Sequence, residues 1–188
     1  MIIVMGLPGA GKTTVLKEVV KGLPKFKIVN YGDAMLDVAL KEGVVSHRDE
    51  MRKLPLSKQK EIQKKAAEKL SREKGNVLLD THCSIKITHG YLPGLPFSIL
   101  KELNPTAFVL IVAPIKDVVR RRNEDLSRKR DKLSEEEILE DMLANKIYLF
   151  SYSAMTGAPL AIIENADGKL RKAVTRLKEF LEEKDLHE

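Results

Sequence analysis

The sequence contains very little cysteine and no long apolar run, and both absences exclude whole classes of protein. Cys83 is the single cysteine among 188 residues, so an internal disulfide and a zinc cluster of several thiolates are excluded. No apolar run approaches the roughly 20 residues that a membrane-spanning helix needs. The N-terminus also lacks the basic flank and cleavage site of a secretory signal. We therefore expect a cytoplasmic protein without a membrane segment.

Size and composition are those of one folded domain. With 43% hydrophobic and 32% charged residues, a chain of 188 residues is long enough to bury a sizeable core. Its formal net charge is +6. An excess of cations suits an RNA-binding surface, but it equally suits a pocket for several phosphate groups. Charge alone does not separate these two interpretations.

A phosphate-binding motif follows the first apolar run. Residues 6–14 read GLPGAGKTT and match G-x-x-x-x-G-K-[ST] in every fixed position. Glycines let this loop turn so that consecutive N–H groups converge on phosphate oxygens, and Lys12 reaches the outer phosphates. A helix that begins near Lys12 directs its N-terminal dipole at the same anion. The residues predicted to bind a nucleoside triphosphate are Gly6, Leu7, Pro8, Gly9, Ala10, Gly11, Lys12, Thr13 and Thr14.

Segments typical of strands alternate with segments typical of helices, which predicts an α/β fold with a parallel sheet flanked by helices. We expect strands over residues 2–5, 26–30, 76–80, 107–112 and 160–163. We expect helices over residues 12–21, 34–42, 57–74, 115–122, 134–153 and 169–183. Ser134 and Glu137 have the spacing of a capping box at the start of the 134–153 helix.

Asp80 ends the apolar segment VLLD and occupies the position of a Walker B aspartate. Ligands of parallel α/β sheets bind beyond the carboxyl ends of the strands, so this carboxylate is expected near the phosphates. Thr13 and Asp80 are predicted to hold magnesium, partly through water. The alternative for Asp80 is a carboxylate that caps the next turn. Thr81 replaces the glutamate with which many motor ATPases activate water, which favours transfer to a bound acceptor over hydrolysis.

Two further segments are candidates for binding a phosphate acceptor. Arg48 and Arg52 are four residues apart, so an α-helix would place both guanidinium groups on one face, where they could clamp a phosphate. An exposed face of ion pairs with Asp49 and Glu50 is an equally good interpretation. Tyr31 and Gly32 follow the second predicted strand and could frame an acceptor base, although a turn and helix cap are as natural there.

The residues after the third strand offer other candidates for the same pocket. His82 follows Asp80 at the strand end, where a polar supporting role is favoured over proton transfer. Tyr91 begins the segment YLPGLP, a proline-bounded loop that could wall a base pocket or simply turn the chain.

A basic cluster at residues 120–132 holds seven positive and three negative side chains. In a phosphate-transfer enzyme, a closing lid in this position would bring arginines over the triphosphate and neutralise its charge. A solvated helix end and an RNA-binding patch are the alternatives.

Taken in order, the segments GLPGAGKTT, NYGDAM, HRDEMRKL, VLLDTHCSIK, GYLPGLP and RRRNEDLSRKRD resemble the archaeal type of adenylate kinase. The resemblance extends from Ile2 to about Ile163. It implies a P-loop fold with a five-stranded parallel sheet, magnesium-bound ATP as donor, AMP as acceptor, and a homotrimer. It also implies a monophosphate-binding segment at about 31–75 and a short lid at about 120–133, without zinc because no set of four cysteines is present.

The resemblance assigns roles to individual residues. It places Gly9 to Thr14 on ATP, with Lys12 as a catalytic residue. It places Arg48 and Arg52 near the AMP phosphate, and with the candidates derived above the predicted AMP site comprises Tyr31, Gly32, Arg48, Arg52, His82 and Tyr91. It makes Arg121, Arg128 and Arg130 the catalytic arginines of the lid.

The chemistry of a phosphate acceptor fits this inventory independently. The second pKa of a phosphate monoester is about 6, so the attacking oxygen is already deprotonated at neutral pH and needs no general base. Magnesium, in-line positioning and several cations are sufficient. A GTP switch is disfavoured because the string at 145–148 lacks the aspartate of a guanine reader. Two other hypotheses are a hydroxyl kinase with Asp33 or Asp80 as base, and a protein whose main role is RNA binding.

The predicted helix at 134–153 has apolar residues on more than one face. Ordinary core packing explains such a pattern, but the excess also makes this helix the place to expect a subunit interface. The residues concerned are Ile138, Leu139, Met142, Leu143, Ile147, Leu149 and Phe150.

Overall fold

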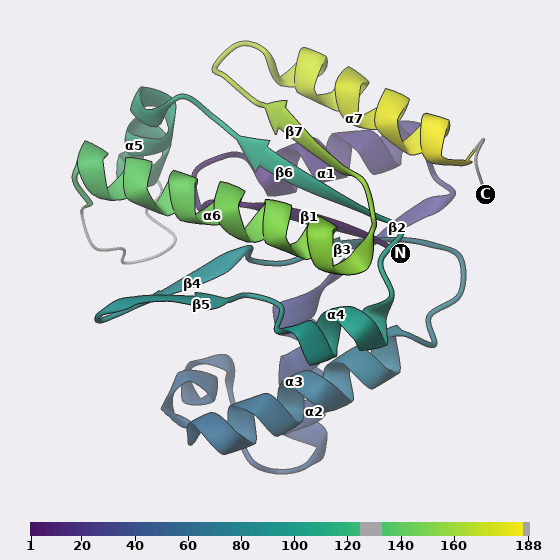
Figure 1. The fold of residues 1–188 in the computed structure, drawn as a ribbon, viewed down its shortest axis with the longest axis vertical. Helices are drawn as coiled ribbons and strands as arrows, with labels where there is room; N and C mark the ends of the chain where they lie inside the picture. Colours follow the sequence, from purple (N-terminus) through teal and green to yellow (C-terminus); the bar gives the residue numbers. More distant parts are fainter. Residues whose placement is uncertain (125–132, 186–188) are drawn as a thin grey trace.

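Five parallel strands form the central sheet of the computed structural model, in the order β2-β3-β1-β6-β7 (Figure 1). The structure describes residues 1–124 and 133–185, except the side chains of Arg52, Lys184 and Asp185. Strands of a sheet covered on both faces are apolar throughout, and the segments IIVM and AFVLIV have this composition. The strands are β1 Ile2–Gly6, β2 Phe26–Asn30, β3 Asn76–Asp80, β6 Ala107–Val112 and β7 Leu160–Glu164.

Helices cover both faces of the sheet and make two separate apolar cores. Val4, Leu78 and Val109 point to the face covered by α1 and α7. Met5 and Phe108 point to the opposite face, covered by α3, α4 and α6. This alternation follows from the pleat of the strands. The helices are α1 Lys12–Gly22, α3 Leu56–Leu70, α4 Phe97–Leu103, α6 Glu135–Thr156 and α7 Leu170–Asp185.

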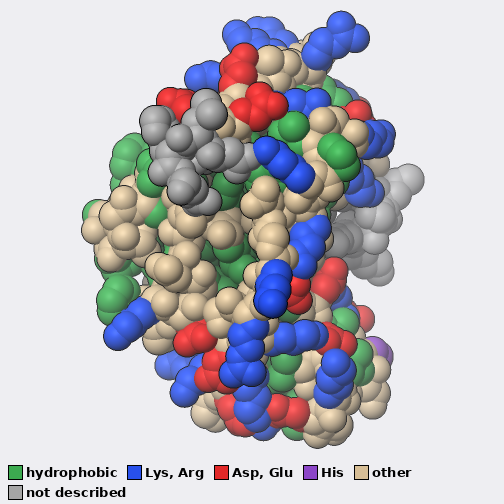
Figure 2. Space-filling model, turned by 90° about the vertical axis from the view of Figure 1, so that its right-hand side faces the viewer, with side chains coloured by type: hydrophobic (Ala, Val, Ile, Leu, Met, Phe, Trp, Pro, Cys, Tyr) green, Lys and Arg blue, Asp and Glu red, His purple; other side chains and the backbone are tan. Residues whose placement is uncertain are grey.

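The chain between β2 and β3 forms a helical segment with a small core of its own. It contains α2 Tyr31–Lys41, the 3₁₀-helix η1 Arg48–Lys53 and α3, and its buried members are Ala39, Val45 and Ile62. In Figure 1 this segment lies at the end of the molecule opposite α7. On the face shown in Figure 2, positive and negative side chains are intermixed over this end rather than separated. Asn30 caps α2 by accepting a hydrogen bond from the Asp33 backbone N–H at 3.0 Å.

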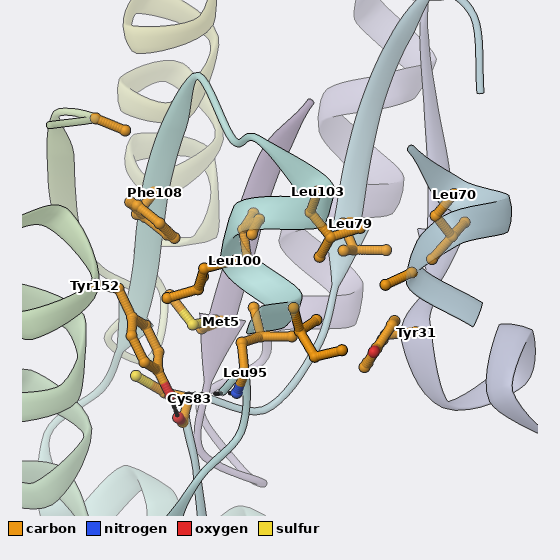
Figure 3. Close-up of a cluster of buried hydrophobic side chains, with 14 of the residues drawn as sticks. Met5, Tyr31, Leu70, Leu79, Cys83, Leu95, Leu100, Leu103, Phe108 and Tyr152 are labelled. Atoms are coloured by element: carbon orange, nitrogen blue, oxygen red, sulfur yellow. Dashed lines mark hydrogen bonds between the residues drawn. The ribbon is translucent and has the colours of Figure 1, made fainter. Parts of the chain in front are cut away.

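A buried tyrosine joins α6 to the chain that follows β3. The Tyr152 hydroxyl donates to the Cys83 carbonyl oxygen at 2.6 Å and accepts from the Leu95 N–H at 3.3 Å. Figure 3 shows these contacts among the apolar side chains of the core. Because Tyr152 is 1% exposed, the two hydrogen bonds satisfy a polar group that water does not reach. They fix the start of the loop that leads from Asp80 toward α4.

The five predicted strands are confirmed, each within one residue, and the helix over 134–153 begins with the expected capping box. Two predictions were wrong in detail. The segment around Tyr91 is half of an antiparallel hairpin, β4 Ser84–Ile87 and β5 Gly90–Pro93, and not a loop. Residues 48–53 form a 3₁₀-helix and not an α-helix, so the α-helical spacing from which a shared face was predicted does not apply to them.

Within the described residues, no helix is both long enough and apolar enough to cross a membrane.

The two small elements that the sequence did not indicate, the β4–β5 hairpin and α4, both lie between β3 and β6.

Candidate active site

The phosphate-binding loop runs from the end of β1 to the start of α1, at the carboxyl edge of the sheet (Figure 1). Gly9 and Gly11 have φ angles of 92° and 80°, which are strained for any residue with a Cβ. Gly6 lies against β6, where an added Cβ would come 2.7 Å from the Ile111 carbonyl oxygen. Lys12 is the first residue of α1, so the helix N-terminus points into the loop.

Lys12 is held over the end of β3. Its Nζ forms an ion pair with Asp80 and donates a hydrogen bond to the Thr81 carbonyl oxygen at 2.7 Å. Both charged side chains are nearly buried, at 12% and 10% exposure. Burial lowers the pKa of Lys12, and the neighbouring Asp80 carboxylate opposes that shift. The second carboxylate oxygen of Asp80 accepts from the Asn30 amide at 3.2 Å, which ties β3 to β2.

The oxygen donors near this pair fit magnesium better than a transition metal. Among the described residues, no group of three His, Cys, Asp or Glu side chains is placed to hold an ion. Magnesium commonly takes one or two protein oxygens and completes its shell with water and substrate phosphates. Asp80 supplies a carboxylate, and Thr13 is an exposed hydroxyl residue in the first turn of α1. These two are the residues that could hold the ion.

The start of α2 and the 3₁₀-helix meet beside the same edge. Arg48 forms an ion pair with Asp33 through Nη2, and a Cβ on Gly32 would lie 3.8 Å from its Nη1. Gly32 thus lies beside the guanidinium of Arg48, at a distance where a Cβ would make an ordinary contact. Both partners of the pair are more than half exposed, so its contribution to stability is small. The side chain of Arg52 lies outside the described part of the structure.

Two aromatic residues predicted to face an acceptor base are engaged elsewhere. Tyr31 is 3% exposed, and its hydroxyl donates to the Gln63 carbonyl oxygen of α3 at 2.9 Å. Tyr91 donates to Asp141 of α6 at 2.7 Å, and its carbonyl oxygen accepts from Tyr148 at 3.0 Å. Tyr31 thus links α2 to α3, and Tyr91 links β5 to α6.

His82 is exposed at the end of β3, as its position in the sequence predicts. The loop after β5 packs directly on its backbone: Gly94 N–H donates to the Cys83 carbonyl oxygen at 2.9 Å. A Cβ on Gly94 would overlap the His82 carbonyl oxygen. The segments DTH and GYLPGLP are close to each other in the sequence and in space. They therefore form one packed unit beside Asp80.

Arg121 lies on α5 Ile115–Glu124 and contacts the phosphate loop, whereas the sequence interpretation placed it in a lid. Its guanidinium donates to the Gly9 carbonyl oxygen at 3.2 Å, to the Asn165 carbonyl oxygen at 2.9 Å and to Asp167 at 2.7 Å. Residues 115–124 form one continuous α-helix, so Arg121 belongs to α5. Arg128 and Arg130 lie outside the described residues.

Sequence reasoning missed several residues that shape the loop. Asn165 donates from Nδ2 to the Ala10 carbonyl oxygen at 2.9 Å, and Arg122 donates to that of Pro8 at 2.8 Å. The signal for Asn165 was available, because it directly follows β7 and the carboxyl ends of parallel strands meet at the ligand edge. For Arg122, no local pattern distinguishes it from its two arginine neighbours.

Comparison with known proteins agrees with this geometry. A family model described as an AAA domain matches residues 5–139. The adenylate kinase of Methanopyrus kandleri is 47% identical over 186 residues, a match that covers 97% of this chain and 96% of that protein. The adenylate kinase of Methanocaldococcus jannaschii is 43% identical over 187 residues, covering 96% of this chain and 97% of that protein.

Solved structures of shikimate kinases share the fold. The enzyme from Acinetobacter baumannii in complex with shikimate aligns with a TM-score of 0.62 at 17% identity, covering 96% of this chain and 91% of that one. The enzyme from Bacteroides thetaiotaomicron gives 0.60 at 14% identity, covering 96% and 97%. At such identities the likeness concerns the fold alone. The near full-length matches at more than 40% identity show more: this chain belongs to the adenylate kinase family.

Proposed function

We propose that this protein catalyses the reversible transfer of the terminal phosphoryl group of ATP to AMP, giving two ADP, with magnesium as cofactor. The observation that carries the proposal is the buried Lys12–Asp80 pair at the end of the phosphate loop. Family membership supports the choice of nucleotides, since the relatives that match along nearly their whole length are adenylate kinases.

The donor half of the reaction requires positive potential around a triphosphate. The N-terminus of α1 and backbone N–H groups of the phosphate loop supply partial charge, and Lys12 supplies a full one. On binding, Lys12 exchanges the Thr81 carbonyl oxygen for a phosphate oxygen, so a charge that burial disfavours gains a stronger partner. Magnesium, when held by Thr13 and Asp80, neutralises part of the charge on the phosphates.

The acceptor half of the reaction requires a cation for the AMP phosphate and a space beside it. Arg48 supplies the cation, because its side chain is more than half exposed and the exposed Asp33 is a partner that a phosphate dianion can replace. The monophosphate is already ionised at neutral pH, so no general base is needed. In this proposal Arg52 and His82 also contact AMP, while Tyr31 and Tyr91 act by holding the surrounding backbone.

The region 120–133 completes the proposed site as a lid, with residues 31–75 as the monophosphate-binding segment. Arg128 and Arg130 are proposed to cover the phosphates during transfer, where their charges would stabilise a loose transition state. Arg121 contributes from the base of this region, through its hydrogen bond to the phosphate loop.

We further propose that the protein assembles as a homotrimer through α6 and works in the cytoplasm. Four apolar side chains of α6 are each at least 55% exposed and recur at intervals of three or four residues: Leu139, Leu143, Ile147 and Phe150. This spacing puts them on one face of the helix. A contiguous apolar face of this kind is typical of a protein interface, and a second copy is the occupant that the family resemblance favours.

An acceptor panel tests the proposed reaction. The purified protein is mixed with ATP, magnesium and one of AMP, GMP, CMP, UMP, shikimate or buffer alone, and the nucleotides are separated by chromatography. The proposal predicts two ADP formed for each AMP consumed, with the other mixtures at least tenfold slower. Faster transfer to an alcohol would support a hydroxyl kinase instead. Tight, salt-sensitive RNA binding without AMP-dependent turnover would support a role in RNA binding.

A further inference from the structure

Three consecutive carbonyl groups of the phosphate loop are held by side chains from outside the loop. Each accepts a hydrogen bond from a residue that belongs to α5 or follows β7. The pairs are Pro8 with Arg122 at 2.8 Å, Gly9 with Arg121 at 3.2 Å, and Ala10 with Asn165 at 2.9 Å. Each fixed carbonyl also fixes the orientation of its peptide plane.

The orientation of the peptide between Ala10 and Gly11 matters most for phosphate binding. In a trans peptide, the C=O of one residue and the N–H of the next point in opposite directions. Because the Ala10 carbonyl points at the Asn165 amide, the N–H of Gly11 points away from that amide. Gly11 immediately precedes Lys12, at the N-terminus of α1, where anions bind. The N–H of Ala10, by contrast, is used within the loop by Leu7 at 3.0 Å.

Asn165 is itself fixed from several sides. It is 4% exposed, and its backbone N–H donates to the Val112 carbonyl oxygen at the end of β6 at 2.8 Å. Its own carbonyl oxygen accepts from Arg121 at 2.9 Å. A Cβ on Gly11 would overlap the Asn165 amide nitrogen, so the contact between loop and side chain is fully packed. Such a residue has little freedom to follow the loop if the loop moves.

The chemistry of the contact requires an amide. A carbonyl oxygen only accepts hydrogen bonds, so the NH₂ group of Asn165 has to face Ala10. Aspartate has the same shape but no donor at neutral pH, and its charge would lie beside the donor phosphates. Alanine removes the donor without adding charge.

We infer that Asn165 is a positioning residue for the donor triphosphate: by holding the Ala10 carbonyl, it aims the Gly11 N–H at the phosphates before the nucleotide arrives. The inference rests on the function proposed above. A positioning role differs from a purely structural role in what a substitution changes. Replacing Asn165 should weaken the binding of ATP and leave the binding of AMP unaffected.

Calorimetric titration of each nucleotide alone, in magnesium buffer, tests this inference without turnover. We expect Asn165→Ala and Asn165→Asp to raise the Kd for ATP about tenfold or more, with the Kd for AMP changed by less than twofold. In the full reaction, the KM for ATP rises more than that for AMP. Asn165→Asp keeps the side-chain volume, so it serves as the test if Asn165→Ala does not fold. Ser153→Ala is the control, because Ser153 donates to the Ala158 carbonyl oxygen at 2.7 Å at the other end of β7.

Three outcomes would overturn the inference. An unchanged Kd for ATP in a folded Asn165 variant would show that the amide does not position the loop. Equal weakening of ATP and AMP, or an equal loss in Ser153→Ala, would show a general structural role. If the unsubstituted protein bound no ATP, the proposed function would fail first, and the inference with it.

Discussion

The ion pair of Lys12 and Asp80 prepares the phosphate site, but burying its two charges costs the fold stability. A lysine with 12% exposure loses most of its hydration, and the loss is offset by the Asp80 carboxylate and the Thr81 carbonyl oxygen. In the proposed reaction, a phosphate oxygen of the bound nucleotide would replace the Thr81 carbonyl oxygen. Lys12 is a structural ion-pair partner, and in the proposed function it is also the cation on which transfer depends.

Replacing Lys12 by alanine is expected to lower kcat about a thousandfold, because transition-state charge then lacks a cation in a site that excludes water. The variant should remain folded, although Asp80 loses its counter-charge and keeps only the Asn30 amide. Steady-state kinetics measures the loss of kcat, and circular dichroism checks that the variant is folded. Lys17→Ala, an exposed lysine of the same helix, is the control and should have normal activity. Normal turnover in Lys12→Ala would contradict the mechanism.

Cys83 gives a second prediction at this scale, on alkaline stability. Burial raises the pKa of its thiol to about 12, whereas the thiol of an unfolded chain ionises near 9. Between these values the unfolded state binds fewer protons than the native state, so stability is full below pH 9 and falls as the pH rises. The slope reaches about 1.4 kcal/mol per pH unit for one group.

Denaturant titrations at pH 8 and pH 10 measure this effect for the wild type and Cys83→Ala. The variant should be less stable at both values but should lose less stability between them. The native thiol should also react slowly with a thiol reagent, since it is 1% exposed. Identical losses in the two proteins would show that Cys83 does not contribute to the pH dependence.

At the scale of elements, the sequence predicted those strands and loops whose formation depends on local sequence patterns. The strands at β1 and β6 are continuous apolar runs, and the phosphate loop is a contiguous motif, so neither depends on distant contacts. The 3₁₀-helix at Arg48–Lys53 was misjudged because residue spacing alone does not distinguish 3.0 from 3.6 residues per turn. The hairpin around Tyr91 depends on α6, which supplies Asp141 and Tyr148 from 50 or more residues away.

The same reasoning explains which site residues were predictable. Lys12 and Asp80 each end or follow an apolar strand, and the structure brings them together as the motifs indicate. Arg121 sits in a run of three arginines, and only the tertiary fold shows that it binds Gly9 and Asp167. Asn165 directly follows a strand, which was the one available signal, but no motif surrounds it, and its contact with the phosphate loop across 155 residues was missed.

Gly94 allows the loop after β5 to pack on the end of β3, which gives a prediction for this element. An added Cβ would overlap the His82 carbonyl oxygen, a backbone atom that cannot easily move. We expect Gly94→Ala to lower the free energy of unfolding by about 1–3 kcal/mol, measured by denaturant titration.

Gly22→Ala is the matched control for this substitution. Its Cβ would meet the flexible end of Lys178, and the position is helical, so the change should be neutral or stabilising. If both alanine variants have the same stability, close packing at Gly94 is not what holds the loop.

At the scale of the whole molecule, the proposed trimer would form through the exposed apolar face of α6. Leu143 and Ile147 are 58% and 57% exposed, one turn apart, at the middle of the apolar face. Sedimentation should give three times the 21.1 kDa monomer for the wild type. Leu143→Glu combined with Ile147→Lys should shift the protein toward monomer, because charged groups would be buried in the interface.

Lys172→Glu, an exposed change on α7, which covers the opposite face of the sheet, should leave the assembly intact. A monomeric wild type would contradict the proposed trimer, and an unchanged oligomer in the double variant would place the interface elsewhere.

The central claim is phosphoryl transfer between two adenine nucleotides, and ADP alone tests it most directly. Phosphorus NMR would follow ADP and magnesium after the protein is added, with Lys12→Ala as the parallel sample. The proposed function predicts that ATP and AMP appear in equal amounts without free phosphate, up to a constant ratio that is also reached from ATP and AMP. Unchanged ADP, or release of inorganic phosphate in its place, would contradict it.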